Sequence, residues 1–233
     1  MKESRAIYLQ PTAIIDSDQL PVERYAKQTV AGCYDQVEQA VRLYLAVRDG
    51  IRYDPYCAFH LPVHYQASKV LAKGRGFCVP KASLLCALAR ACGIPTRLGF
   101  ATVRNHLATK QLLDFLGSNL FVYHGFVEFY LEGKWVKATP TFNRELCERH
   151  GVPPLEFDGR HDSLFHPYDA QNNRFMEYVA HHGTFADVPV DLIVAAWKDA
   201  YGEARVQEWI QLFAEKEGVA AARDFTRETV CKD

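Results

Sequence analysis

Apolar residues in the first half of the chain recur at the spacing of helices. From Asp35 to Gly50 they stand three or four positions apart, which predicts one amphipathic helix. Asp35 and Glu38 have the spacing of a capping box, and Gly50 can end the helix. Further helices are predicted at about 21–31 and 78–92.

The pattern changes to that of strands after residue 95. Apolar runs at 96–104, 120–131 and 135–139 predict three strands. Glu132 and Gly133 separate the last two runs, which predicts a hairpin with a two-residue turn.

The hairpin fixes which residues share a face of the predicted sheet. With a two-residue turn, residue 131 pairs with residue 134, so His124 lies opposite Thr141. Thr139 and Asn143 then become its diagonal neighbours on the same face.

The ends of the chain complete the outline. Residues 5–15 are predicted to form an opening strand or extended arm. Residues 143–190 are rich in His, Asp, Pro and Gly and are predicted to be irregular. Helices are predicted at about 190–201 and 205–217, with a short third near 219–228. Helices followed by antiparallel strands, without βαβ alternation, predict an α+β fold.

Composition and charge exclude several classes of function. The chain has 233 residues, 48% of them apolar, and a net charge of −1, so it lacks the basic field of a nucleic-acid binder. No apolar run approaches the roughly 18 residues of a membrane helix, and the N-terminus has no signal-peptide pattern. We therefore expect a cytoplasmic protein that binds neither nucleic acid nor membrane.

The cysteines and histidines predict neither disulfides nor a metal centre. The seven cysteines are odd in number and form no CxxC pair, which favours free thiols. His60 and His64 have the i, i+4 spacing of metal ligands, but Pro62 lies between them and no glutamate stands at position 61. No cofactor and no metal are expected.

Cys78 is the candidate nucleophile. It stands at the predicted start of a helix, where unpaired N–H groups and a partial positive charge favour the thiolate. The same N–H groups can stabilise the oxyanion of an acyl intermediate. The other cysteines fit small buried residues or, for Cys231, a terminal tail.

His124 is the candidate general base, because it stands in the middle of an apolar strand. The alternative is a hydrogen-bonded core histidine. A base histidine also needs a partner for its second ring nitrogen, and Thr139 and Asn143 are the two local candidates.

Two blocks of sequence resemble the transglutaminase-like superfamily of papain-type folds. The first is Gly76-Phe77-Cys78, followed by an apolar helix and Gly93-Ile94-Pro95-Thr96-Arg97, similar to the family's G-x-C nucleophile and GIPxR exit. The second runs from His124 to Leu131 and continues to Pro140-Thr141, similar to the family's HxWxEVYL…GWVxxDPT block. The resemblance covers roughly residues 35–143.

The resemblance implies a papain-like α+β fold in which the nucleophile helix packs on an antiparallel sheet. The core would be residues 35–143. Residues 1–34 would wrap it, and residues 144–233 would add an irregular loop and a helical C-terminal extension of the same domain.

The family's catalytic triad is Cys, His and Asp. Cys78 and His124 match, but the aspartate position holds Thr139, which carries no charge. Asn143 is the alternative orienter, and an acid from the irregular segment, such as Asp158 or Asp162, is a further candidate.

The expected chemistry is acyl transfer through a thioester on a peptide or protein amide. Water as acceptor would make the protein a protease or amidase, and an amine acceptor would make it a transglutaminase. An arylamine N-acetyltransferase-like acyl transferase is one alternative. A non-catalytic binding domain is the other, and Thr139 in place of an acid favours it.

Overall fold

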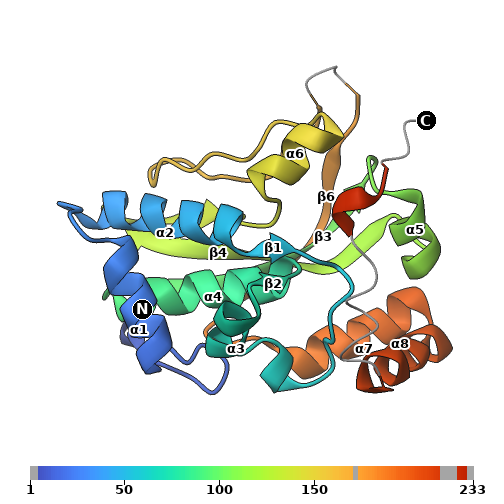
Figure 1. Cartoon of the computed structure of the whole chain (residues 1–233), viewed down its shortest axis with the longest axis horizontal. Coiled ribbons are helices and arrows are strands. Elements are labelled where there is room, and N and C mark those ends of the chain that lie inside the picture. The colour runs from blue at the N-terminus through green and yellow to red at the C-terminus, as the bar shows by residue number, and fades with distance from the viewer. Residues whose placement is uncertain (1–4, 170–172, 216–224, 230–233) are drawn as a thin grey trace.

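The computed structural model describes residues 5–169, 173–215 and 225–229. Its centre is an antiparallel sheet in the order β5-β4-β3-β6 (Figure 1). The strands are β3 (Thr96–Asn105), β4 (Leu120–Leu131), β5 (Lys134–Ala138) and β6 (Met176–Phe185).

The β4–β5 hairpin has the register that the sequence predicts. Leu131 pairs with Lys134, and the ladder continues to the pair of Val127 with Ala138. Glu132 and Gly133 both have positive φ, 47° and 88°, and form the two-residue turn. The ladder ends at Ala138, so Thr139 and Thr141 lie just beyond its paired part.

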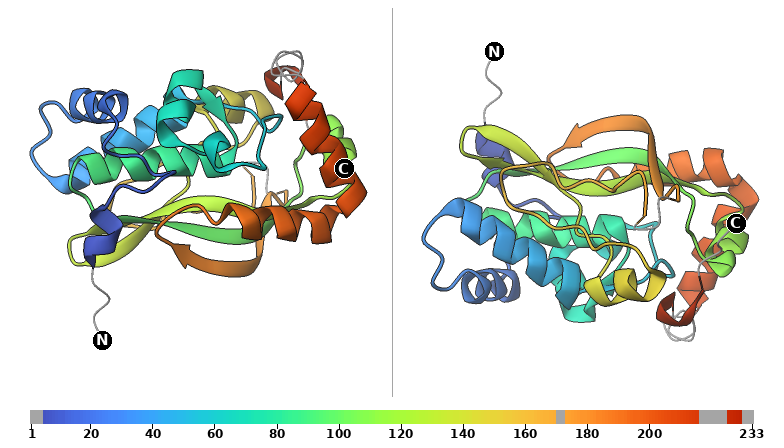
Figure 2. Two further views of the ribbon diagram at one scale, coloured as in Figure 1. Left: turned by 90° about the horizontal axis from the view of Figure 1, so that it is seen from below. Right: turned by 90° about the horizontal axis from the view of Figure 1, so that it is seen from above.

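Four helices form a layer on one face of the sheet (Figure 2). They are α1 (Leu20–Thr29), α2 (Gln36–Gly50), α3 (Ala67–Lys73) and α4 (Cys78–Ala91). Helix α4 is buried along nearly its whole length and shares the main apolar core with Val127 and Phe129 of β4. Its run of small and apolar side chains suits this central position.

Helix α2 is capped by one half of the predicted capping box. The Asp35 carboxylate accepts from the Glu38 N–H at 2.8 Å. The Glu38 carboxylate accepts from the Tyr34 N–H at 3.0 Å instead of from residue 35. Helix α1 begins without a side-chain cap.

The other face of the sheet is covered by chain that the sequence predicts to be irregular. The same segment also contains strand β6 and helix α6 (Arg144–His150), and α6 lies on the side of α2 (Figure 2), so the prediction for 143–190 is wrong there. A second apolar cluster joins it to Ala101, Val103 and Phe126 of the sheet. Strand β6 escapes prediction because it is an edge strand whose side chains are mostly exposed.

The predictions for the two ends of the chain need correction or extension, and one helix in the middle of the chain is not predicted. Residues Arg5–Leu9 form a 3-10 helix and no strand, and the ring of Tyr8 in it packs on that of Trp135 with centroids 5.3 Å apart. Helix α5 (Lys110–Leu116) is not predicted. Of the segment near 219–228, a 3-10 helix at Phe225–Arg227 is described, and residues 219–224 lie outside the described residues.

Helices α7 (Val190–Tyr201) and α8 (Glu203–Glu215) confirm the two predicted C-terminal helices. They lie at one end of the sheet, beside α5 (Figures 1 and 2). In the described part of the chain, no helix is both long and apolar enough to cross a bilayer.

Candidate functional site

Cys78 is the first residue of α4, as the sequence predicts. It follows Gly76 of the short strand β2 (Arg75–Gly76), which pairs in parallel with β1 (Arg52–Tyr53). A Cβ on Gly76 would lie 2.8 Å from Cβ of Pro80, so glycine is needed for the chain to turn this closely into the helix. Phe77 provides no side-chain cap, which leaves the first N–H groups of α4 for the sulfur or a ligand.

The thiol of Cys78 is less acidic than its place at the helix start suggests. The backbone N–H groups of Gly125, Val79 and Cys78 itself hydrogen-bond the sulfur and lower its pKa. Burial acts in the opposite direction and is the larger effect, so the pKa rises to about 11. The expectation of a lowered pKa is therefore wrong for this state of the site, which holds a neutral thiol.

His124 lies in β4, directly after a β-bulge. Ala101 pairs with His124 and Val103 with Phe121, so two residues of β4 face the single Thr102 of β3. Tyr123, in the bulge, has a φ of 57°, which is uncommon for a residue with a side chain. Backbone strain of this kind is concentrated at functional sites.

The imidazole of His124 is buried and neutral. Its ring lies 4.9 Å from the ring of Phe165, and Nε2 has no hydrogen-bond partner among the described residues. Burial lowers the pKa of His124 to about 3. Both candidate catalytic groups are thus uncharged over most of the pH range.

Helix α4 and strand β4 touch where these two residues lie. A Cβ on Gly125 would lie 3.1 Å from Cα of Val79, so glycine allows the strand and the helix to approach this closely. The Gly125 N–H, next in sequence to His124, bonds the sulfur of Cys78. Cys78 and His124 line one cavity.

Helix α7 hydrogen-bonds the bulge that precedes His124. The Tyr201 hydroxyl accepts from the Val122 N–H at 2.9 Å and donates to the Leu120 carbonyl at 3.0 Å. The Trp197 indole N–H donates to the Val122 carbonyl at 2.8 Å. Sequence reasoning missed both aromatic residues, because their i, i+4 spacing signals only a packed helix face.

Thr139, at the aspartate position of the family pattern, is buried just beyond β5. The Tyr178 hydroxyl of β6 lies next to it. Burial raises the pKa of Tyr178 to about 12, so this phenol is neutral. No carboxylate occupies position 139, and Tyr178 is a polar neighbour that the sequence pattern does not reveal.

Asn143 is occupied elsewhere. Its carboxamide oxygen accepts from the Tyr53 N–H at 2.7 Å. Its amide group donates to the carbonyls of Arg48 and Ile51, the latter at 2.8 Å. The Asn143 side chain therefore joins the end of α2 to β1 by hydrogen bonds. Asn143 does not line the cavity that holds Cys78 and His124.

The two aspartates considered as alternative acids are also bound elsewhere. Asp158 accepts from the N–H of His161 at 2.8 Å and contacts its ring at 2.6 Å. Asp162 accepts from the Lys137 N–H at 2.9 Å.

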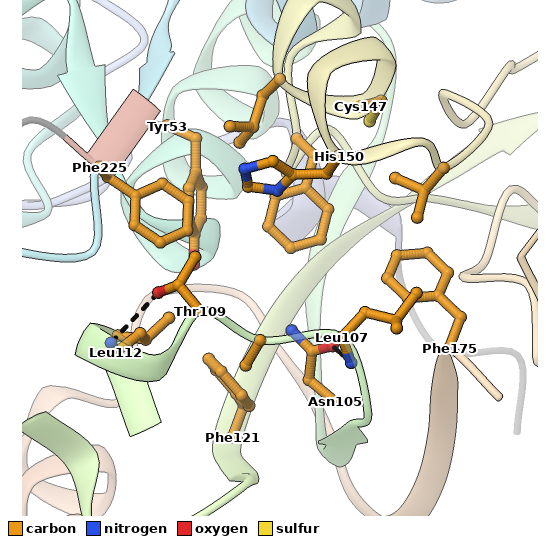
Figure 3. Close-up of a pocket in the computed structure, with 14 residues that line it drawn as sticks. Tyr53, Asn105, Leu107, Thr109, Leu112, Phe121, Cys147, His150, Phe175 and Phe225 are labelled. Atoms are coloured by element: carbon orange, nitrogen blue, oxygen red, sulfur yellow. Dashed lines mark hydrogen bonds between the residues drawn. The ribbon is translucent and has the colours of Figure 1, made fainter. Parts of the chain in front are cut away.

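A second cavity adjoins the first and shares Tyr53, Leu112 and Phe121 with it. Figure 3 shows the ring of Phe225 beside Tyr53, with His150 nearby. The rings of Tyr53 and Phe225 have centroids 5.3 Å apart. Phe225 thus closes one side of this cavity.

Described cysteines and histidines form no metal centre. Six cysteines are free thiols, and Cys231 lies outside the described residues. The rings of His60 and His64 lie 4.9 Å apart. No group of three or more metal-ligating side chains occurs among the described residues.

Comparison with known proteins identifies the family. Residues 23–140 match the sequence profile of the transglutaminase-like superfamily core, which is half of the chain, so the protein belongs to this superfamily. This confirms the resemblance and the predicted fold class. No curated protein matches the sequence.

Solved structures resemble this chain at low identity, and one of them shares its fold. One from Cytophaga hutchinsonii, provisionally assigned as a cysteine protease, has a TM-score of 0.51 and 14% identity over 83% of this chain and 50% of its own. One from Parabacteroides distasonis, provisionally assigned as a protease, has a TM-score of 0.37 and 15% identity over 60% of this chain and 27% of its own. This chain therefore spans half or less of the length of either protein.

Proposed function

We propose that the protein is a cysteine-dependent amide or peptide hydrolase that works through a thioester on Cys78. The observation that carries the proposal is the shared cavity. A thiol at the start of a buried helix lies beside a strained strand that holds a buried histidine. Membership of the superfamily and the protease assignment of the Cytophaga structure support the same chemistry.

The neutral states of both groups suit a general-base mechanism. As the Cys78 sulfur attacks the carbonyl carbon, its proton passes to the imidazole of His124. The N–H groups at the start of α4 and the Gly125 N–H stabilise the resulting oxyanion. His124 then protonates the leaving amine, and the acyl group remains on sulfur as a thioester.

Water completes hydrolysis: His124 takes a proton from the water as its oxygen bonds the acyl carbon. The carbon–sulfur bond then breaks, the carboxylic acid leaves, and His124 returns the proton to the sulfur of Cys78. An amine in place of water would give transamidation at the same thioester. We propose water as the acceptor, because the apolar cavity offers no charged side chain among the described residues to position an amine.

A non-catalytic binding domain is the second candidate. Thr139 at the position of the family's aspartate favours it, because threonine cannot stabilise an imidazolium by charge. In that case the cavity would hold a peptide without turnover.

The deciding experiment is acylation by p-nitrophenyl acetate, a small activated ester. Release of p-nitrophenolate is followed by absorbance, and mass spectrometry locates the acetyl group. We expect a burst with acetylation of Cys78 that is lost in Cys78→Ala and reduced at least about 100-fold in His124→Ala. Cys33→Ser, which removes a thiol far along the chain from the site, is the control and should react like the wild type. No acetylation of Cys78 would refute the hydrolase and favour the binding domain.

A further inference from the structure

We propose that the substrate carries an aromatic or branched aliphatic group on the acyl side of the scissile bond, and that the cavity beside Cys78 binds this group. The inference rests on the proposed function, since it concerns the same thioester. It adds the chemical class of the acyl group.

The walls of the cavity come from segments far apart in the sequence. Residues Pro55, Phe59 and Phe77 contribute one side, next to Cys78. Helix α5 contributes the side chains of Leu112, Phe115 and Leu116. All of these surfaces are apolar.

Helices α7 and α8 close the cavity with further aromatic rings. Trp209 of α8 stacks on Phe115 of α5, with ring centroids 4.7 Å apart and an angle of 18° between the planes. The ring centroids of Trp197 of α7 and Phe59 lie 4.8 Å apart. Phe213 of α8 also lines the cavity. Flat ring faces of this kind favour aromatic and branched aliphatic ligands.

Two polar groups of these walls are already bonded to the protein. The indole N–H of Trp197 and the hydroxyl of Tyr201 bond the backbone of β4. Among the described lining residues, no Asp, Glu, Lys or Arg side chain reaches the cavity. A glutamine or glutamate side chain would therefore lose its hydration there against walls that are mostly apolar.

This difference should decide which acyl groups reach Cys78. A site that leaves a buried polar group unpaired discriminates strongly against it. We expect a phenylalanyl group to acylate Cys78 at least about tenfold faster than a glutaminyl group, which is about 1.4 kcal/mol of transition-state free energy. A transamidase that acts on glutamine would show the opposite preference, with the glutaminyl group reacting faster.

The test uses p-nitrophenyl esters of N-acetyl-phenylalanine, N-acetyl-leucine, N-acetyl-glutamine and N-acetyl-glutamate with the full chain. The leaving group is the same in all four, so only the acyl group varies. The second-order acylation rate is measured from p-nitrophenolate release, after subtraction of the Cys78→Ala rate. Phenylalanyl and leucyl esters should react at least about tenfold faster than the other two.

Equal rates for the four esters, or faster reaction of the glutaminyl ester, would overturn the assignment while acetylation of Cys78 still upheld the hydrolase. No reaction with p-nitrophenyl acetate would overturn the hydrolase and this assignment with it.

A charge placed in the wall gives an independent test. Leu116 lines the cavity and is half-buried, whereas Leu192 is an exposed leucine of α7 outside it. We expect Leu116→Arg to lower the ratio of phenylalanyl to glutamyl acylation at least about tenfold, because the guanidinium can pair with the carboxylate. Leu192→Arg should leave the ratio unchanged. A folded Leu116→Arg variant with the wild-type ratio contradicts the assignment, and the ester series decides if that variant fails to fold.

Discussion

At the scale of single residues, burial controls the state of the site. The helix start and three N–H groups favour the Cys78 thiolate, yet desolvation outweighs them. The same desolvation keeps His124 neutral. The thiol of Cys78 therefore keeps its proton, the imidazole of His124 is neutral, and the two do not form an ion pair in this state.

The first prediction concerns pH. His124 must be unprotonated to act as base, and it gains a proton only as the pH falls towards about 3. The Cys78 thiol loses its proton only as the pH approaches about 11. Cys78-dependent acylation by a neutral ester should therefore change less than about threefold between about pH 5 and pH 9. A rate that falls steeply below pH 7 in a stopped-flow profile would show that His124 titrates near its ordinary pKa.

The second prediction tests position 139. Thr139→Asp should raise the pKa of His124, because a carboxylate at the family's aspartate position would favour the imidazolium. Acylation of Cys78 at pH 7 should then increase about tenfold. The pKa is measured from the imidazole proton signals by NMR. Thr139→Asn is the matched control, because asparagine has the shape of aspartate without its charge. Equal pKa values and equal rates for the two variants would exclude an orienting role for position 139.

The third prediction concerns Asn143. Asn143→Ala should lower the free energy of unfolding by about 2 kcal/mol, since the Tyr53 N–H loses its partner and the carbonyls of Arg48 and Ile51 keep only the Lys81 ammonium. The acylation rate of the folded variant should not change. Urea unfolding gives the stability, with Asn173→Ala as a milder comparison, because the Asn173 side chain donates to the Asp169 carboxylate at 2.9 Å in a loop. A loss of rate at unchanged stability would restore Asn143 as an orienter.

Sequence reasoning identifies residues by local pattern and misses what distant chain does to them. The Gly76-Phe77-Cys78 pattern before an apolar run places the thiol at the start of a helix, and the structure has it there. The burial that sets its pKa comes partly from α7 and α8, more than a hundred residues further along. Periodicity carries no information about that contact.

At the scale of elements, the bulge in β4 links the site to the C-terminal helices. The bulge shifts the register of β4 against β3 just before His124. It also leaves the Val122 N–H and carbonyl without partners in β3. Tyr201 and Trp197 supply the missing hydrogen bonds. Helix α7 is therefore a positioning element for His124.

The fourth prediction removes one of these bonds. Tyr201→Phe keeps the ring but leaves the Val122 N–H unpaired. We expect the maximal acylation rate to fall about tenfold while half-saturation by the ester stays within about twofold, because His124 shifts and the cavity walls remain. Steady-state kinetics separate the two quantities. Tyr34→Phe, at a tyrosine 97% exposed, is the control. A change confined to half-saturation would assign Tyr201 to binding only.

The elements differ in how far the sequence predicts them. The β4–β5 hairpin is predicted to the register, because a two-residue turn and alternating side chains are local signals. Strand β6 cannot be predicted from the sequence pattern, because its mostly exposed side chains lack the apolar–polar alternation of a half-buried strand. Its pairing with β3 is a long-range contact that no local pattern specifies.

At the scale of the whole molecule, the superfamily core depends on chain beyond residue 143. Strand β6 covers one edge of β3, and residues after 144 cover the second face of the sheet. The Tyr44 hydroxyl and the Arg48 guanidinium of α2 both donate to the Leu155 carbonyl. Residues 35–143 and the chain after residue 144 therefore pack against each other.

The fifth prediction follows from this sharing. A chain of residues 1–143 should show no cooperative urea transition and no near-ultraviolet circular dichroism, because one edge and one face of its sheet are uncovered. Addition of residues 144–233 as a separate chain should restore both signals. Cooperative unfolding of the shorter chain alone would show that the core is an independent unit.

The position of β6 and α7 in the sequence also governs when the site can form in a newly made molecule. Ribosomes make the chain from its N-terminus, so Cys78 and His124 emerge well before the strand and helix that set their geometry. Until Tyr201 leaves the ribosome, the Val122 bonds that place His124 do not exist. The site therefore reaches its final geometry only after Tyr201 has been made, and until then a nascent Cys78 has no positioned histidine beside it.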